Sequence, residues 1–145
     1  MVLGIDPMAA DEMRALLVRA SFGHLACARD NRPYVVPMNY AYDGHDLYFF
    51  TTEGTKTEII NANPEVCFQV EEVADSSHWR SVMVVGAAHS LARPDEVERA
   101  MRLITERNPT LTPALNQTEV GAWERPSNIA LYRLRPRAVS GRKTV

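Results

Sequence analysis

The sequence predicts an α+β fold, namely a small β-barrel, closed or split, of six mostly antiparallel strands with peripheral helices. Six apolar stretches have the length and composition of strands, and short turns separate several of them. The chain has 145 residues, of which 46% are hydrophobic, so we expect residues 1–145 to form one domain. Side chains fill the interior of so small a barrel, and a ligand must therefore sit outside it, at a rim or between subunits.

The N-terminal segment is predicted to form the first helix. Asp6 is a suitable N-cap and Pro7 suits the first helical position, so we expect the helix to begin at Asp6. The stretch SFGH at 21–24 ends the helical pattern. One apolar face of this helix contains Met13, Leu16, Leu17 and Ala20.

Three strands are expected next. HLACAR (24–29) ends at the turn DNRP, YVVPMNYAY (34–42) ends at DGHD, and LYFFTT (47–52) follows that turn. Pro37 interrupts the second of these strands. Since proline cannot donate a ladder hydrogen bond, it indicates an edge, a bulge or the end of pairing, and it leaves neighbouring backbone groups available to a ligand.

A short helix and two longer strands follow. Thr55 is the expected cap of the helix, with Glu58 as its partner in a capping box, and NANP (61–64) ends it. VCFQVEEV (66–73) and WRSVMVVGAAHSLA (79–92) are the expected fourth and fifth strands. A glycine within the fifth strand, Gly86, indicates a bulge or the close approach of other backbone.

The last helix is expected to begin at Pro94 and to end at the NP of 108–109. A polar loop to Pro126 and a sixth strand, NIALYRL (128–134), follow it. The basic run YRLRPRAVSGRK (132–143) is interpreted as a strand whose arginines face solvent. The apolar face of the last helix contains Val97, Met101 and Ile104.

Composition argues against several classes of protein. The net charge of −2 and the pI of about 6.1 are unlike those of a protein whose main task is to bind nucleic acid. No apolar run is long enough to span a bilayer, and the N-terminus lacks the features of a signal peptide, so we expect a cytoplasmic protein without membrane partners. Cys27 and Cys67 form no CxxC pair and are expected to be buried, inert thiols, and the four histidines lack metal-ligand spacing. Motifs of Rossmann, Walker, zincin and hydrolase-elbow sites are absent.

The strongest functional signal is the stretch TTEGTK (51–56). Lys56 is one of only two lysines, and it lies in the first turn of a predicted helix, where unpaired N–H groups already make the helix end positive. Together with those N–H groups, Lys56 and the hydroxyls of Thr51, Thr52 and Thr55 would form an anion site suited to a phosphate monoester. The alternative is a solvated lysine that costs only about a few tenths of a kcal/mol.

Two other stretches place polar groups among apolar ones. In VVPMNYAY (35–42), Asn39 and Tyr40 suit the edge of a flat heteroaromatic ring, and WRS (79–81) supplies an indole, a guanidinium and a hydroxyl. Ordinary strand composition is the alternative for both. His24 and Tyr40 are the candidates for a catalytic acid or base, and a structural or solvent-facing histidine is the alternative for His24.

Taken in order, these motifs resemble the pyridoxamine 5′-phosphate oxidase-like FMN-binding split barrels, in particular the small branch that includes nitroimidazole-resistance-type flavoproteins. The resemblance covers residues 20–92, with a weaker echo at 129–136, and rests on the order PMNY, YFFTT, GTK, NP, VCFQV and WRSV. It implies a homodimer with FMN in the interface grooves and an oxidoreductase that acts on a small molecule. It also implies ring contacts from Val36, Pro37, Met38, Asn39 and Tyr40, ribityl and phosphate contacts from Phe50, Thr51, Thr52, Thr55 and Lys56, and cofactor contacts from Arg80 and Ser81.

The sequence also departs from the oxidases that name the family. Those enzymes carry an Arg-Lys pair in the phosphate turn, whereas Thr55 precedes Lys56 here, and their C-terminal substrate-binding residues have no counterpart. Oxidation of vitamin B6 is therefore not expected. Two alternatives stay open: use of the deazaflavin F420 on the same fold, and a non-catalytic flavin or ligand sensor. No haem-ligating pattern is evident.

Overall fold

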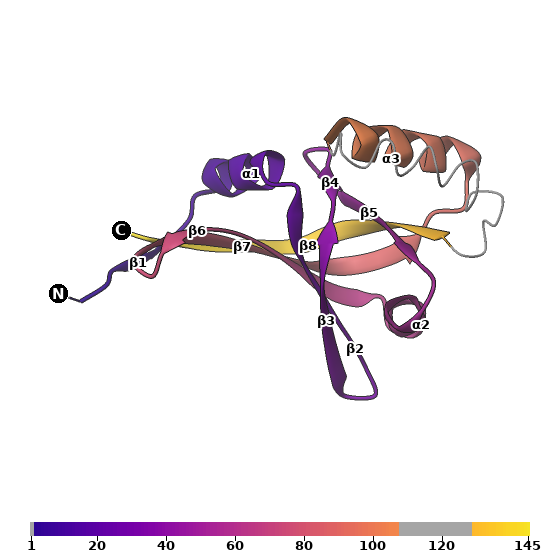
Figure 1. Cartoon of the computed structure of the whole chain (residues 1–145), viewed down its shortest axis with the longest axis horizontal. Coiled ribbons are helices and arrows are strands. Elements are labelled where there is room, and N and C mark those ends of the chain that lie inside the picture. Colours follow the sequence, from indigo (N-terminus) through magenta and orange to yellow (C-terminus); the bar gives the residue numbers. More distant parts are fainter. Residues whose placement is uncertain (1, 108–128) are drawn as a thin grey trace.

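In the computed structural model, which describes residues 2–107 and 129–145, one antiparallel sheet of eight strands is accompanied by three helices (Figure 1). Two helices, α1 and α3, lie above the long ribbon of β6, β7 and β8 in Figure 1, and the β2–β3 hairpin extends below it. The elements are β1 (Ile5–Pro7), α1 (Ala10–Arg19), β2 (Phe22–Arg29), β3 (Arg32–Asn39), β4 (Ala41–Tyr42), β5 (Leu47–Thr52), α2 (Thr55–Ala62), β6 (Glu65–Asp75), β7 (His78–Ser90), α3 (Pro94–Arg107) and β8 (Ile129–Thr144).

The strand order explains how the barrel closes. The order is β3-β2-β6-β7-β8-β5-β4, with β1 paired to β8 outside this path. Its two end strands, β3 and β4, are consecutive in the chain and are separated only by Tyr40. The chain itself, rather than a hydrogen-bonded ladder, therefore joins the two edges of the sheet, as in a split barrel. The predicted α+β class and antiparallel order are confirmed, and the count of six strands is wrong because the short β1 and β4 lack a strand pattern of their own.

The predicted start of the first helix is also wrong. Asp6 and Pro7 belong to β1, where they pair with Lys143 and Arg142 of β8, and α1 begins only at Ala10. The reason is that β8 continues to Thr144 and offers an edge that β1 covers. This long-range pairing outweighs the local helix-start signal. β8 extends ten residues beyond the predicted NIALYRL strand, and the interpretation of the basic run 132–143 as a strand is confirmed. The predicted apolar face is confirmed, since Leu16 and Leu17 are buried and Met13 and Ala20 pack against the same core.

The cap of α2 is shifted by one residue from the prediction. Gly54 is the N-cap, and Thr55 is the first helical residue. The Thr57 hydroxyl, rather than Thr55, serves the cap: it accepts from the Gly54 N–H at 2.8 Å and donates to the Gly54 carbonyl at 2.9 Å. The helix ends before Asn63, as the NANP signal predicts.

Two apolar clusters hold the elements together. In the barrel, the aromatic rings of Phe49 and Tyr132 stack with centroids 5.4 Å apart, and Leu16, Leu17 and Ile60 of the helices enter the same cluster. A second cluster forms under α3, where buried Ala100 and Ile104 meet Ala41, Tyr48 and Leu131 of the sheet. The predicted start of α3 and its apolar face are confirmed, whereas its predicted stop at 108–109 and the polar loop lie outside the described residues.

The two cysteines are free thiols, as expected. Cys27 is buried and Cys67 is partly buried, and burial raises the pKa of both thiols. Within residues 2–107 and 129–145, no helix is long and apolar enough to cross a bilayer.

The predicted bulge at Gly86 is confirmed and marks a close approach of the β7 and β8 backbones. The register shifts between Val85 and Gly86, because Val85 pairs with Ala138 whereas Gly86 pairs with Pro136. A Cβ atom on residue 86 would overlap the carbonyl group of Arg135. Only a residue without a side chain therefore fits here, and the bulge fixes the register of both strands.

Gly86→Ala should consequently destabilise the protein by at least about 2 kcal/mol, since the backbone of β8 has to move to admit the methyl group. Urea denaturation of the purified variant measures this loss. Gly54→Ala is the matched control, because no atom lies within 4 Å of a Cβ built there, and we expect it to cost less than about 1 kcal/mol. Equal stability of Gly86→Ala and the wild type would contradict the proposed role of the bulge.

Candidate functional site

The start of α2 presents unpaired backbone donors. The first helical hydrogen bond runs from the Glu58 N–H to the Gly54 carbonyl at 3.0 Å. The N–H groups of Thr55, Lys56 and Thr57 precede that bond, and no acceptor for them exists among the described residues. Because the helix dipole adds to these donors, this end of α2 attracts an anion.

Lys56 adds a full positive charge at the same place. It is half-buried and forms no ion pair within the described part of the chain, whereas the other lysine, Lys143, lies 2.7 Å from a Glu12 carboxylate oxygen. Lys56 is also within electrostatic reach of Cys27 on β2: burial raises the pKa of the Cys27 thiol, and the ammonium group partly opposes that rise. The sequence-predicted anion site therefore has the donors and the uncompensated charge that it needs.

The hydroxyls predicted for this site divide between two environments. Thr52 and Thr55 are exposed beside the helix start. Thr51 is buried, and its hydroxyl donates to the Thr52 carbonyl at 3.2 Å. Phe50 lies on the side of β5 opposite to Thr51, the side that Thr52 shares, and it packs into the cluster under α3. Thr52 and Thr55 are therefore the side chains that can reach a phosphate, while those of Thr51 and Phe50 support the strand.

The ring-binding residues predicted on β3 alternate between the two faces of the sheet. Val36 packs against the barrel core and Met38 is buried in it, whereas Pro37 and Asn39 point to the outer face. β3 is an edge strand that pairs with β2 alone among the described strands, which confirms the edge predicted from Pro37. Its free edge leaves backbone N–H and carbonyl groups available to a ligand.

Tyr40, predicted as a ring contact and a candidate acid or base, lies inside the molecule. Its side chain is fully buried, its hydroxyl donates to the Leu17 carbonyl at 2.6 Å, and its ring meets Phe68 edge to face with centroids 5.1 Å apart. Burial raises the pKa of the Tyr40 phenol far above its ordinary value, so the group stays protonated. These contacts give the side chain a structural role, which is to hold the end of α1 against the β3–β4 crossover.

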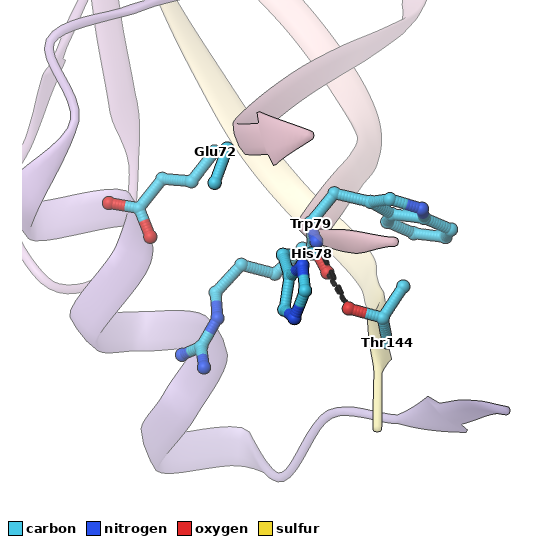
Figure 2. Close-up of a pocket in the computed structure, with 6 residues that line it drawn as sticks. Glu72, His78, Trp79 and Thr144 are labelled. Atoms are coloured by element: carbon cyan, nitrogen blue, oxygen red, sulfur yellow. Dashed lines mark hydrogen bonds between the residues drawn. The ribbon is translucent and has the colours of Figure 1, made fainter. Parts of the chain in front are cut away.

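Arg80 and Ser81 are consecutive on β7 and therefore point to opposite faces of the sheet. Arg80 lies opposite Glu72 in the β6–β7 register and lines a pocket of about 280 Å³ at the end of this hairpin, together with Trp79 and Thr144. Figure 2 shows this pocket, with Glu72 set apart from His78, Trp79 and Thr144; the Thr144 hydroxyl bridges the Trp79 N–H and carbonyl at 3.0 and 3.3 Å. Along β6, Cys67 pairs with Ala26 of β2, next to Cys27, whereas Glu72, five residues farther along, pairs with Arg80 of β7. Arg80 is thus roughly 17 Å along the sheet from the pair Ala26–Cys67, whose neighbour Cys27 is influenced by the Lys56 charge. A single chain therefore does not bring Arg80 and Lys56 together.

Ser81 instead takes part in a polar row on the outer face. The His24 Nδ1 atom lies 3.2 Å from Gln69 Oε1, and Gln69 Nε2 donates to Ser81 Oγ at 2.8 Å. A Glu71 carboxylate oxygen lies 3.8 Å from the same His24 nitrogen. The structure therefore brings together the two predicted residues His24 and Ser81, and it adds Gln69, which sequence reasoning missed.

The outer face around this row is apolar and open. Register across the sheet aligns Pro37, His24, Gln69 and Met83 on neighbouring strands. Since neighbouring strands lie about 4.8 Å apart, β3 and β7 are about 14 Å apart across this face. Exposed apolar side chains on the same face are Phe22 (50% exposed), Val35 (65%), Val73 (60%) and Met83 (43%).

No group of three or more His, Cys, Asp or Glu side chains among the described residues is arranged to hold a metal ion.

Comparison with known proteins finds relatives in sequence and in fold. An uncharacterized protein of Rhizobium meliloti (strain 1021) is 37% identical over 84 residues, which cover 58% of this chain and 56% of that relative. The crystal structure of an FAD-binding protein from Mesorhizobium loti superimposes with a TM-score of 0.77 and 32% identity, covering 99% of both chains. A structure from Bacteroides thetaiotaomicron described as a 5-nitroimidazole antibiotic resistance protein also gives a TM-score of 0.77, at 18% identity, over 99% of this chain and 90% of that one.

The family comparison covers nearly the whole chain. The model of a family described as pyridoxamine 5′-phosphate oxidase matches residues 9–143, which include every strand except β1 in full or nearly in full. The match therefore includes the helix start at Lys56, the free edge of β3 and the polar row on the outer face. The chain belongs to the pyridoxamine 5′-phosphate oxidase-like family.

Proposed function

We propose that this protein is a flavoprotein that binds FMN and acts as an oxidoreductase on a small molecule. The observation that carries the proposal is the start of α2, where N–H groups and Lys56 have no acceptor and no ion-pair partner among residues 2–107 and 129–145 and could bind an anion. The similarity to an FAD-binding protein over the whole chain supports a flavin as the ligand. Of the flavins, FMN matches a single anion site best because it ends in one phosphate monoester.

Each part of the site then has a task. Lys56, Thr52 and Thr55 would hold the phosphate, and the outer side of β3, with Pro37 and Asn39, would lie along the ring. A bound flavin supplies the hydride chemistry, so the chain has only to orient it, exclude water and leave one side open to substrate. His24 is the titratable side chain nearest to Pro37 on that face, and we propose it as the group that exchanges a proton with the substrate.

A second copy of the chain would complete the site. Phe22, Val35 and Met83 are exposed on a face that also carries the predicted contacts Pro37, Asn39 and Ser81. Arg80 and Lys56 do not meet within one chain, which fits a cofactor held between two subunits. We therefore propose an isologous homodimer that pairs these faces and buries at least about 2,000 Å² in total, as permanent homodimers do.

The first test is spectroscopic. Protein purified without added cofactor should carry the near-ultraviolet and blue absorbance of bound flavin, and turnover with a nicotinamide donor then separates an enzyme from a sensor. Titration with FMN, FAD, F420 and riboflavin identifies the preferred ligand. Preference for F420 over every flavin would replace this proposal with its deazaflavin alternative.

Lys56→Ala should weaken FMN binding by about 10- to 100-fold, because a charge-assisted contact is worth about 1.5–3 kcal/mol. Riboflavin lacks the phosphate, so its dissociation constant should change by less than about twofold. The stability of the apo-protein should stay the same or rise by about a few tenths of a kcal/mol, since the variant removes a cation from a positive helix end. Fluorescence titration with both ligands and thermal melting of the apo-protein measure these effects.

Two variants control this experiment. Lys56→Arg keeps the charge and should retain most of the FMN affinity. Lys143→Ala removes the same charge from a lysine that Glu12 already pairs, so the ratio of FMN to riboflavin affinity should not change. Equal losses of both ligands in Lys56→Ala would place Lys56 at the ring or in the fold, and no loss of either would show a solvated lysine.

Light scattering should report twice the chain mass of 16.3 kDa, and Met83→Glu should shift the protein toward monomer with loss of flavin. The carboxylate introduced by that change would have to be buried in an apolar interface without a partner. Val18→Glu is the control, because Val18 on α1 is 46% exposed, close to the 43% of Met83, but lies away from the outer sheet face. A monomer that still holds flavin would rule out the shared site.

A further inference from the structure

Gln69 connects two side chains that stand 57 residues apart in the sequence, His24 and Ser81. Register makes this possible: His24 of β2 lies directly opposite Gln69 of β6, and Ser81 of β7 lies opposite Glu71, two residues farther along β6. The amide of Gln69 offers both an acceptor and a donor, so it can accept from one neighbour while it donates to the other.

The direction of the row follows from Glu71. Its carboxylate oxygen lies 3.8 Å from His24 Nδ1, so an N–H at Nδ1 would face the carboxylate as a donor, whereas a lone pair at Nδ1 would face another acceptor. The Nδ1–H then donates to Gln69 Oε1 at 3.2 Å, which leaves the amide NH₂ to face Ser81. Gln69 Nε2 accordingly donates to Ser81 Oγ at 2.8 Å.

Ser81 is left with a proton to donate. Its oxygen already accepts from Gln69, and within the described part of the chain the Ser81 hydroxyl donates to no acceptor. The side chain is only partly buried and opens onto the same face as Met83, where an incoming group can reach it. Because one lone pair of Oγ is taken by Gln69, the directions in which the Ser81 hydroxyl can donate are narrowed.

We propose that Gln69 is a positioning residue, which holds the Ser81 hydroxyl as a hydrogen-bond donor toward an acceptor atom of the flavin ring seated on the outer sheet face. This rests on the proposed function for the identity of the ligand, but the hydrogen-bond row itself belongs to the chain alone. The Ser81 proton serves the ring rather than the phosphate, so its loss should affect FMN and riboflavin equally. Loss of Lys56, in contrast, is expected to weaken the binding of FMN but not that of riboflavin.

The row is tested first without any ligand. In the apo-protein at pH 9, where free imidazole is neutral, ¹⁵N NMR should show the His24 proton on Nδ1, and Gln69→Ala should reduce the fraction of that tautomer. His45, His78 and His89 serve as internal controls, since none of them contacts Gln69. A proton on Nε2 of His24 in the wild type, or a tautomer ratio unchanged by Gln69→Ala, would overturn the proposed direction of the row.

The ligand is tested by a double-mutant cycle. Ser81→Ala should weaken FMN and riboflavin binding by the same factor, about 3- to 10-fold, the loss of one ordinary hydrogen bond. In a Gln69→Glu background, the carboxylate accepts the Ser81 proton itself, so Ser81→Ala should then change either affinity by less than about twofold. Ser140→Ala is the matched control, because Ser140 lies opposite Met83 on the same face without a place in the row, and it should cost nothing.

The possible outcomes separate the two proposals. If Ser81→Ala causes the same loss in both backgrounds, Gln69 does not position Ser81 and the inference is wrong. If FMN loses affinity but riboflavin does not, Ser81 contacts the phosphate instead of the ring. If the wild type binds no flavin at all, the proposed function and the ring acceptor both fail, while the NMR result still decides whether the row exists.

Discussion

The rest of the molecule depends on the pairing of β7 with β8, which runs from Arg80 opposite Lys143 to Ser90 opposite Tyr132. On one side of this ladder, β6 pairs with β7 and is followed in the sheet by β2 and β3. On the other side, β5 and β1 pair with β8. The bulge at Gly86 changes the register in the middle of this ladder. One half of the ladder thereby serves the barrel, and the other half forms the ribbon that α1 covers. The anion site and the outer face are positioned from opposite sides of this ladder.

The two ends of the candidate site are built in different ways. The phosphate end is local, because a glycine cap and a short helix suffice to gather donors around Lys56. The ring end is a sheet surface, and its residues come from strands that meet only in the folded barrel. An open apolar surface alone leaves hydrogen bonds exposed to competition from water. A cover over that surface would lower the local dielectric and strengthen each polar contact in the row of His24, Gln69 and Ser81.

Local signals in the sequence predicted the parts of the fold that local chemistry determines. β5, α3 up to Arg107 and the Gly86 bulge were predictable because a turn, a proline or a glycine marks each of them. The start of α1 was not, because the pairing of Asp6 with Lys143 is decided by an edge 137 residues away. The site shows the same division. Lys56 stood out as a rare residue at a helix start, whereas Gln69 resembles any polar residue of an alternating strand until the register places it opposite His24. Likewise, Tyr40 reads as a polar strand residue, and only the crossover reveals that it is part of the core.

The position of β8 in the chain has a consequence for how the protein is made. β8 follows the seven other strands in the sequence, yet it pairs with three of them: β1, β5 and β7. During synthesis, the apolar faces of β5 and β7 therefore remain without their shared neighbour until residues 129–144 have left the ribosome. Contacts of such large sequence separation form slowly, and exposed strand edges invite association with other chains. This protein is consequently expected to need protection by chaperones late in translation, and products that stop before β8 should aggregate or be degraded rather than persist as partly folded domains.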